Sequence, residues 1–207
     1  MLDDDGKKLA EAFNYLSVVI SIILGLGIGD LLSGCARLIY ARESLAINWL
    51  YGAWVVLLLP VYLVYWWAFW DYRKQVRWTF IAFFFLLVGP IGLYLITVLL
   101  LPETSPQRPF DASAHYLQIR RWFFGLWALL QVWGILLAPW LKEGFTRAAF
   151  LNRYKYAQYI LLAALLAGFF STTPSSVPSR LDTAILAIFW IVLLYLLGTH
   201  RRQLQTS

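Results

Sequence analysis

The chain has 207 residues, of which 61% are hydrophobic and only 14% are charged, and its formal net charge is +6. Soluble domains have about 45–50% apolar and about 25% charged residues, and a globule of this size cannot hide such an apolar excess from water. The composition therefore predicts an integral membrane protein. It excludes a nucleic-acid partner, because no basic tail and no basic patch interleaved with aromatic residues is present.

Six apolar segments reach the roughly 20 residues that a helix needs to cross the hydrocarbon core of a bilayer. Their apolar runs are continuous rather than alternating, which indicates helices and not barrel strands. The connections are short, so we expect one polytopic domain over residues 1–207, an all-α bundle of six transmembrane helices. The expected spans are about 13–39, 47–70, 78–101, 121–141, 154–173 and 181–199.

The distribution of Lys and Arg predicts the orientation, because connections rich in these residues stay in the cytoplasm. Basic residues are more frequent on the side that holds both termini, at 7–8, 73–77, 142–155 and 201–202. Both termini are therefore predicted to be cytoplasmic. Short loops and the absence of an Asn-X-Ser/Thr acceptor suit a multi-pass protein of the plasma membrane, of the bacterial inner-membrane kind.

A row of small residues marks the first span: Ser17, Ser21, Gly25, Gly29 and Ser33 recur every four residues. This spacing keeps the side chains on one helix face, and small side chains let another backbone approach closely. We expect the row to pack against a neighbouring helix of the same chain. Self-association between subunits and the lining of a water path are the alternatives.

Asp30 is the only acidic residue well inside a predicted span, toward the outer end of the first helix. An isolated charge at the bilayer centre costs roughly 2.5–3.5 kcal/mol on insertion scales, so Asp30 needs a partner or water. Arg37 continues the small-residue row and lies about 10 Å further along the axis. Either the two residues form an interfacial ion pair that sets the helix register, or Asp30 is a binding or proton-accepting carboxylate facing an outer vestibule.

Two prolines, Pro60 and Pro90, lie near the middle of the second and third spans. A proline removes the hydrogen bond to the carbonyl four residues earlier, which leaves the carbonyls of Val56 and Leu86 in need of a donor. Gln131, in the middle of the fourth span, has an amide that could serve. This predicts a polar cluster at the bilayer midplane, as in transporters with broken helices. The alternative is ordinary kinks, with Gln131 joining two helices.

The longest connection, about 102–120, is predicted to be external. Asp111 is expected to cap a short helix that runs through His115 into the fourth span. The two residues are spaced i, i+4, so the aspartate could orient the imidazole as half of an acid–base or metal site. The alternative is a plain N-cap followed by an interfacial histidine.

Several chemistries are excluded. No span carries a periodic arginine row or a histidine, and the only lysine in a span is Lys155, at the cytoplasmic edge of the fifth. The only sulfur-bearing residues are Met1 and Cys35. A voltage sensor, a haem pair, a Schiff base and a cysteine zinc site therefore have no candidate residues. We expect neither enzymatic activity nor a cofactor nor a metal.

The leading hypothesis is a small oligomeric channel or carrier for an ion or small solute, in which the small-residue row and the mid-bilayer kinks meet inside the bundle. The first alternative is a non-catalytic membrane subunit or scaffold that binds a partner membrane protein, suggested by 18% aromatic residues including 11 tryptophans. A weaker alternative is an outer-face enzyme or sensor that uses Asp111, His115, Arg120 and Asp30.

Overall fold

A computed structural model gives the arrangement of the chain. It describes residues 2–40, 49–70, 79–101, 111–141, 147–171 and 180–204. Within these ranges, side chains are described except at 2–10, 12, 137–141, 147–155 and 196–204.

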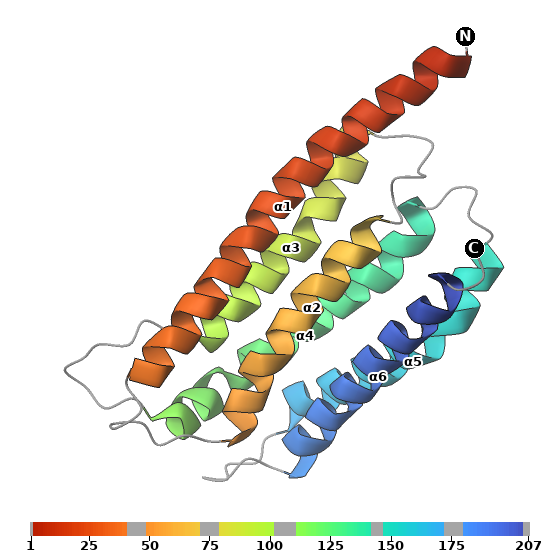
Figure 1. Ribbon diagram of the computed structural model, residues 1–207. Helices are drawn as coiled ribbons and strands as arrows, with labels where there is room; N and C mark the ends of the chain where they lie inside the picture. Colours follow the sequence, from red (N-terminus) through yellow and green to blue (C-terminus); the bar gives the residue numbers. More distant parts are fainter. Residues whose placement is uncertain are drawn as a thin grey trace.

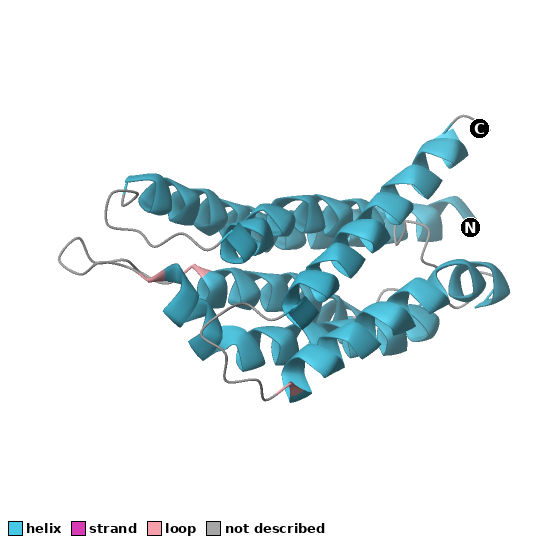
Figure 2. Ribbon diagram, turned by 90° about the horizontal axis from the view of Figure 1, so that it is seen from below, coloured by secondary structure: helices cyan, strands magenta, loops and turns pink. Residues whose placement is uncertain are grey.

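All six regular elements in the described ranges are α-helices, which confirms the predicted all-α fold. The helices are α1 (Leu2–Tyr40), α2 (Trp49–Trp70), α3 (Phe80–Leu100), α4 (Ala112–Leu141), α5 (Arg147–Phe170) and α6 (Arg180–Leu204). Pro60 and Pro90 lie inside α2 and α3 without ending them. Both ends of the chain lie at the same end of the bundle (Figures 1 and 2).

Three helices are long and apolar enough to cross a membrane among the residues that the structure describes: Phe13–Tyr40 of α1, all of α2 and all of α3. A shorter apolar helix runs over Tyr156–Phe170. Large apolar side chains such as Val56 and Phe84 lie exposed on α2 and α3, as expected for helices that face lipid on one side. These helices suggest a membrane protein, and the six spans and their orientation stay predictions.

The second helix occupies the centre of the bundle. It contacts α1, α3, α4 and α6, while α1 packs on α3, α3 on α4, α4 on α5 and α5 on α6. Figure 1 shows α1 beside α3 and α5 beside α6. The other helices therefore surround α2, and the side chains of α2 form much of the interior of the bundle.

Aromatic rings fill that interior. The indole of Trp54 on α2 is 1% exposed, and its ring centroid lies 5.1 Å from Phe123, 5.8 Å from Phe124 and 5.4 Å from Phe189. All three contacts are edge-to-face, a geometry that contributes about 0.5–1.5 kcal/mol per pair beyond simple burial. The space between α2, α4 and α6 is thus occupied by packed side chains.

Local signals account for the described helix ends. Thr79 caps α3, because its hydroxyl oxygen accepts a hydrogen bond from the backbone N–H of Ala82 at 3.2 Å. Leu101 closes the other end of α3, where its N–H donates to the carbonyl of Thr97 at 2.9 Å. The side chain of Leu101 then packs on Gly34 of α1 and joins the two helices at this level.

Candidate functional site

The small-residue row of α1 faces outward. Ser21, Gly25, Gly29 and Ser33 are exposed and Ser17 is half-buried. A Cβ built at Gly25 or at Gly29 would have no atom within 4 Å. The expectation that this row packs against another helix of the same chain, in the bundle interior, is therefore wrong.

Large apolar side chains decide which face of α1 turns inward, because they bury more area than a row of glycine and serine. These side chains are Phe13, Leu16, Ile20, Leu24 and Leu31. The glycines that let neighbours approach lie on this same side. A Cβ at Gly27 would collide with the hydroxyl of Tyr62, and one at Gly34 would lie 2.7 Å from Leu101. The alternatives of self-association and of a water path along the outward row stay predictions.

Two of the serine hydroxyls of the row, those of Ser17 and Ser21, are satisfied by their own helix. Ser17 donates to the carbonyl of Asn14 at 2.7 Å, and Ser21 donates to the carbonyl of Ser17 at 2.6 Å. These serines can therefore face lipid or another helix without an unpaired hydroxyl. The outward row is therefore a surface of small side chains on which the hydroxyls of Ser17 and Ser21 already have hydrogen-bond partners.

Asp30 lies at the edge of this face. It follows Gly29 directly, so its side chain leaves the helix about 100° further around the axis, on the flank that adjoins α3. Asp30 is exposed and lies close enough to the hydroxyl of Tyr94 on α3 to interact with it electrostatically. Next to it, the hydroxyls of Tyr62 and Thr97 lie 2.8 Å apart, and Thr97 also donates to the carbonyl of Leu93 at 3.0 Å. A small polar cluster thus joins α1, α2 and α3.

Arg37 does not belong to this cluster. Among the described residues no ion pair joins Arg37 to Asp30, so the predicted pair that would set the helix register is wrong. Arg37 is half-buried instead, and its Nε has no hydrogen-bond partner. Arg37 interacts electrostatically with Tyr51 of α2, whose hydroxyl donates to the carbonyl of Leu100 at 2.7 Å.

The carbonyl that Pro90 releases has a donor, though not the predicted one. The hydroxyl of Tyr65 on α2 donates to the carbonyl of Leu86 at 3.2 Å. Gly89 makes room for this contact, since a Cβ there would collide with the Tyr65 hydroxyl. One residue earlier, Nε1 of Trp133 on α4 donates to the carbonyl of Phe85 at 3.2 Å.

Gln131 serves a different pair of helices. Its amide Nε2 donates to the backbone carbonyl of Gln158 on α5 at 3.5 Å, away from α2 and α3. No described side chain donates to the carbonyl of Val56, the one released by Pro60. The predicted midplane cluster of Gln131 with the two proline kinks is therefore not assembled, and Gln131 joins α4 to α5.

Asp111 and His115 take separate roles. The Oδ1 atom of Asp111 accepts hydrogen bonds from the N–H groups of Ser113 and Ala114 at 2.9 and 3.0 Å, which confirms the predicted N-cap. His115 is half-buried, and its Nε2 donates to the carbonyl of Leu99 at 3.3 Å. Burial lowers the pKa of His115, although the hydrogen bond to Leu99 opposes that shift. The imidazole of His115 thus joins the first turns of α4 to the last turn of α3.

The strongest ion pair of the described structure was not predicted from the sequence. Arg120 of α4 donates through Nε and Nη2 to the two carboxylate oxygens of Asp182 on α6, at 2.7 and 2.6 Å. Its Nη1 donates to the carbonyl of Ser171 at 3.0 Å. Asp182 is 0% exposed and Arg120 is 7% exposed. The hydrogen bonds to Asp182 raise the pKa of Arg120. Through Asp182 and the carbonyl of Ser171, Arg120 joins α4 to α6 and to the residue that follows α5.

One signal in the sequence could have shown this pair. Arg120 precedes the fourth predicted span, and Asp182 lies just inside the sixth, so the two opposite charges stand at the same depth. The residues of the alternative outer-face enzyme or sensor do not come together, because Arg120 binds Asp182, Asp111 caps α4 and Asp30 lies near Tyr94. In the described ranges no three His, Cys, Asp or Glu side chains come together as a metal site.

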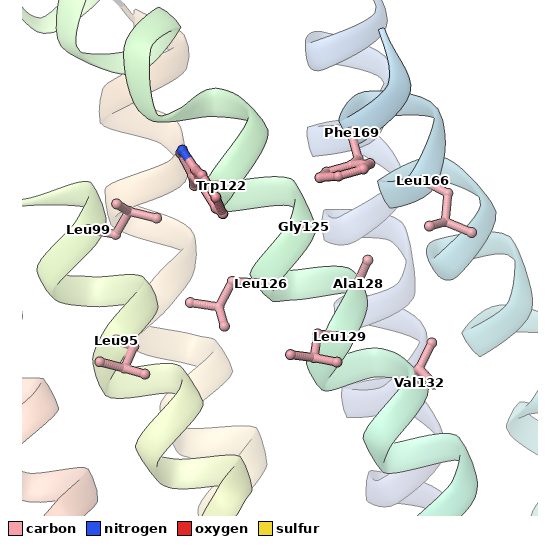
Figure 3. A pocket seen from close by; sticks show the side chains of 10 residues that line it. All are labelled: Leu95, Leu99, Trp122, Gly125, Leu126, Ala128, Leu129, Val132, Leu166 and Phe169. Atoms are coloured by element: carbon pink, nitrogen blue, oxygen red, sulfur yellow. The ribbon is translucent and has the colours of Figure 1, made fainter.

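A groove of about 760 Å³ crosses the outside of α4. Residues of α4 form its floor, and α3 and α5 form its walls (Figure 3). All of the lining residues are apolar or glycine: Leu95, Leu99, Trp122, Gly125, Leu126, Ala128, Leu129, Val132, Leu166 and Phe169.

Comparison with known proteins adds no family. No family model, no curated protein and no solved structure matches this chain. The function is therefore argued from the geometry above.

Proposed function

We propose that this protein is a non-catalytic, multi-pass membrane protein that self-associates through the outward face of α1. The proposal includes six membrane-spanning helices with both termini in the cytoplasm, in the plasma membrane. Three apolar helices support the membrane setting. The contacts of α4 with α2 and α3, of α6 with α2, and of α5 with α4 and α6 support a single six-helix unit.

The observation that carries the proposal is the open space at Gly25 and Gly29. Between helices in a bilayer, association depends on close van der Waals packing, and small residues spaced four apart permit it. The other close approaches of α1 are made by Gly27 and Gly34, which already contact Tyr62 and Leu101. The outward row is thus the remaining face of α1 on which another backbone fits.

Asp30 adds a second reason for that face to be covered. Its described polar neighbour is the hydroxyl of Tyr94, and the side chain is exposed. A carboxylate facing lipid is costly, while one facing a helix interface or water is not. Association through the neighbouring row removes Asp30 from lipid.

Co-purification of two differently tagged copies from the same membranes tests the proposal. We expect the copies to co-purify, and Gly29→Leu to abolish this, because a leucine holds the helices apart. Ala187→Leu is the control, since Ala187 is exposed on α6 and the substitution also places a leucine at an exposed small residue. Equal co-purification in the two variants would contradict the proposal. A stoichiometric partner protein that replaces the second copy would favour the scaffold alternative instead.

A channel or carrier function is a second candidate, and the Asp30–Tyr94 pair is the observation that favours it. Trp54 and its neighbours fill the interior of the single chain, so a path for an ion or small solute fits between copies rather than within one. Association would then bring several Asp30 carboxylates toward one axis. In liposomes we expect cation flux that Asp30→Asn abolishes while co-purification persists. An unchanged flux, or none in wild type, would remove this candidate.

A further inference from the structure

We propose that the groove across α4 binds one phospholipid, with an acyl chain in the groove and the lipid phosphate on Arg121. The groove lies on α3, α4 and α5, separate from the α1 face, so this inference is independent of the proposed self-association. Arg121 is exposed, and its guanidinium carbon lies 5.0 Å from the ring centroid of Phe169, which lines the groove.

The shape of the groove suits an acyl chain of one leaflet. Its floor on α4 extends from Trp122 to Val132, and at 1.5 Å per residue this is roughly 15 Å. Half of a bilayer's hydrocarbon core is also roughly 15 Å thick. Trp122 and Phe169 lie toward the same end of the groove in Figure 3, and Val132 lies toward the other. The groove is therefore apolar and about as long as an acyl chain that spans one leaflet.

The charge at one end of the groove identifies the headgroup chemistry. Arg121 begins the predicted fourth span, at the depth of lipid headgroups, and Trp122 beside it is 73% exposed, as interfacial tryptophans are. Among the described residues no carboxylate pairs with Arg121, whereas the adjacent Arg120 is fully paired with Asp182. A guanidinium without a counter-ion binds a phosphate group readily. A diacylglycerol has the same acyl chains but lacks an anionic group that this arginine could pair with.

Native mass spectrometry of the delipidated full-length protein tests the proposal with two probes, dioleoylphosphatidylglycerol and dioleoylglycerol. The probes have the same acyl chains, and only the first has a phosphate. We expect one bound phospholipid per chain and about ten-fold weaker binding of the diacylglycerol. Arg121→Gln should remove that preference, and Arg180→Gln, at another exposed arginine near the same end of the bundle, should not.

A second variant tests the groove itself. Leu129 lines the groove and is exposed, so Leu129→Trp fills the trough without disturbing the core, and it should weaken the binding of both probes. Each variant should unfold at the wild-type temperature. Equal binding of the two probes, an unchanged preference in Arg121→Gln, or a co-purified protein covering the groove in place of lipid would overturn the proposal.

Discussion

The hydroxyl of Tyr65 on α2 donates a hydrogen bond at 3.2 Å to the carbonyl of Leu86 on α3, four residues before Pro90. Proline at position 90 deprives that carbonyl of its helical donor, and within a bilayer no water can replace it. Gly89 has no side chain to block the contact. The carbonyl released by Pro90 on α3 is thus satisfied by a tyrosine of the neighbouring α2.

Tyr65→Phe should therefore lower the stability of the protein by about 1 kcal/mol, because it leaves the Leu86 carbonyl without its donor. Thermal unfolding in detergent measures the change. Tyr15→Phe is the control, since Tyr15 is exposed on α1 and loses the same hydroxyl. Equal effects of the two substitutions would show that the carbonyl of Leu86 does not depend on Tyr65.

The buried pair of Arg120 and Asp182 should behave differently when one partner or both are removed. Asp182→Leu leaves a buried arginine without its counter-ion, and we expect a loss of about 3–5 kcal/mol in the free energy of unfolding. Combining it with Arg120→Leu should recover much of that loss, because two apolar side chains need no partner. Arg121→Leu, next in sequence but exposed, should change stability by less than about 0.5 kcal/mol. Additive effects of the two buried substitutions would contradict a direct interaction.

Two glycines of α1, two residues apart and therefore on roughly opposite faces of the helix, should respond differently to alanine. Gly27→Ala places a methyl group against the Tyr62 hydroxyl and should destabilise the fold by about 1–3 kcal/mol. Gly29→Ala meets open space and should leave the stability of the detergent-solubilised single chain unchanged or slightly higher, because alanine favours the helix. Unfolding of both variants in detergent measures this. A Gly27→Ala variant as stable as wild type would mean that α1 does not pack closely against Tyr62 of α2.

His115 should make stability depend on pH. Burial lowers its pKa in the folded state below the ordinary value, so the unfolded chain binds the proton more tightly. The stabilisation is present above the unfolded pKa, near 6.5, and is lost as the pH falls toward the lowered folded pKa.

The unfolding temperature measured at pH 7.5 and at pH 5.5 tests this. His115→Asn should reduce the drop between the two pH values relative to wild type. His200→Asn, at the other histidine of the chain, should retain the wild-type drop. An identical pH dependence in wild type and His115→Asn would show that the imidazole is not protected from protonation.

The fold class could be predicted from the sequence because continuous apolar runs leave few other choices. The N-cap at Asp111 could also be predicted, since a cap depends on a few neighbouring residues. Contacts between helices could not. The spacing of Gly25 and Gly29 shows that one face is small, but the large residues on the opposite face determine which side turns inward. Gln131 likewise donates to the carbonyl of Gln158 on α5. The order of the spans along the sequence does not show that these two residues lie close together.

Disulfide cross-linking in intact membranes tests self-association through α1 most directly. In a Cys35→Ser background, which removes the only native cysteine, Gly29→Cys places a thiol on the outward row. Ile191→Cys, exposed on α6, is the matched control. Under mild oxidation we expect a dimer band for Gly29→Cys well above that for Ile191→Cys. Equal bands, or none for Gly29→Cys, would contradict the account.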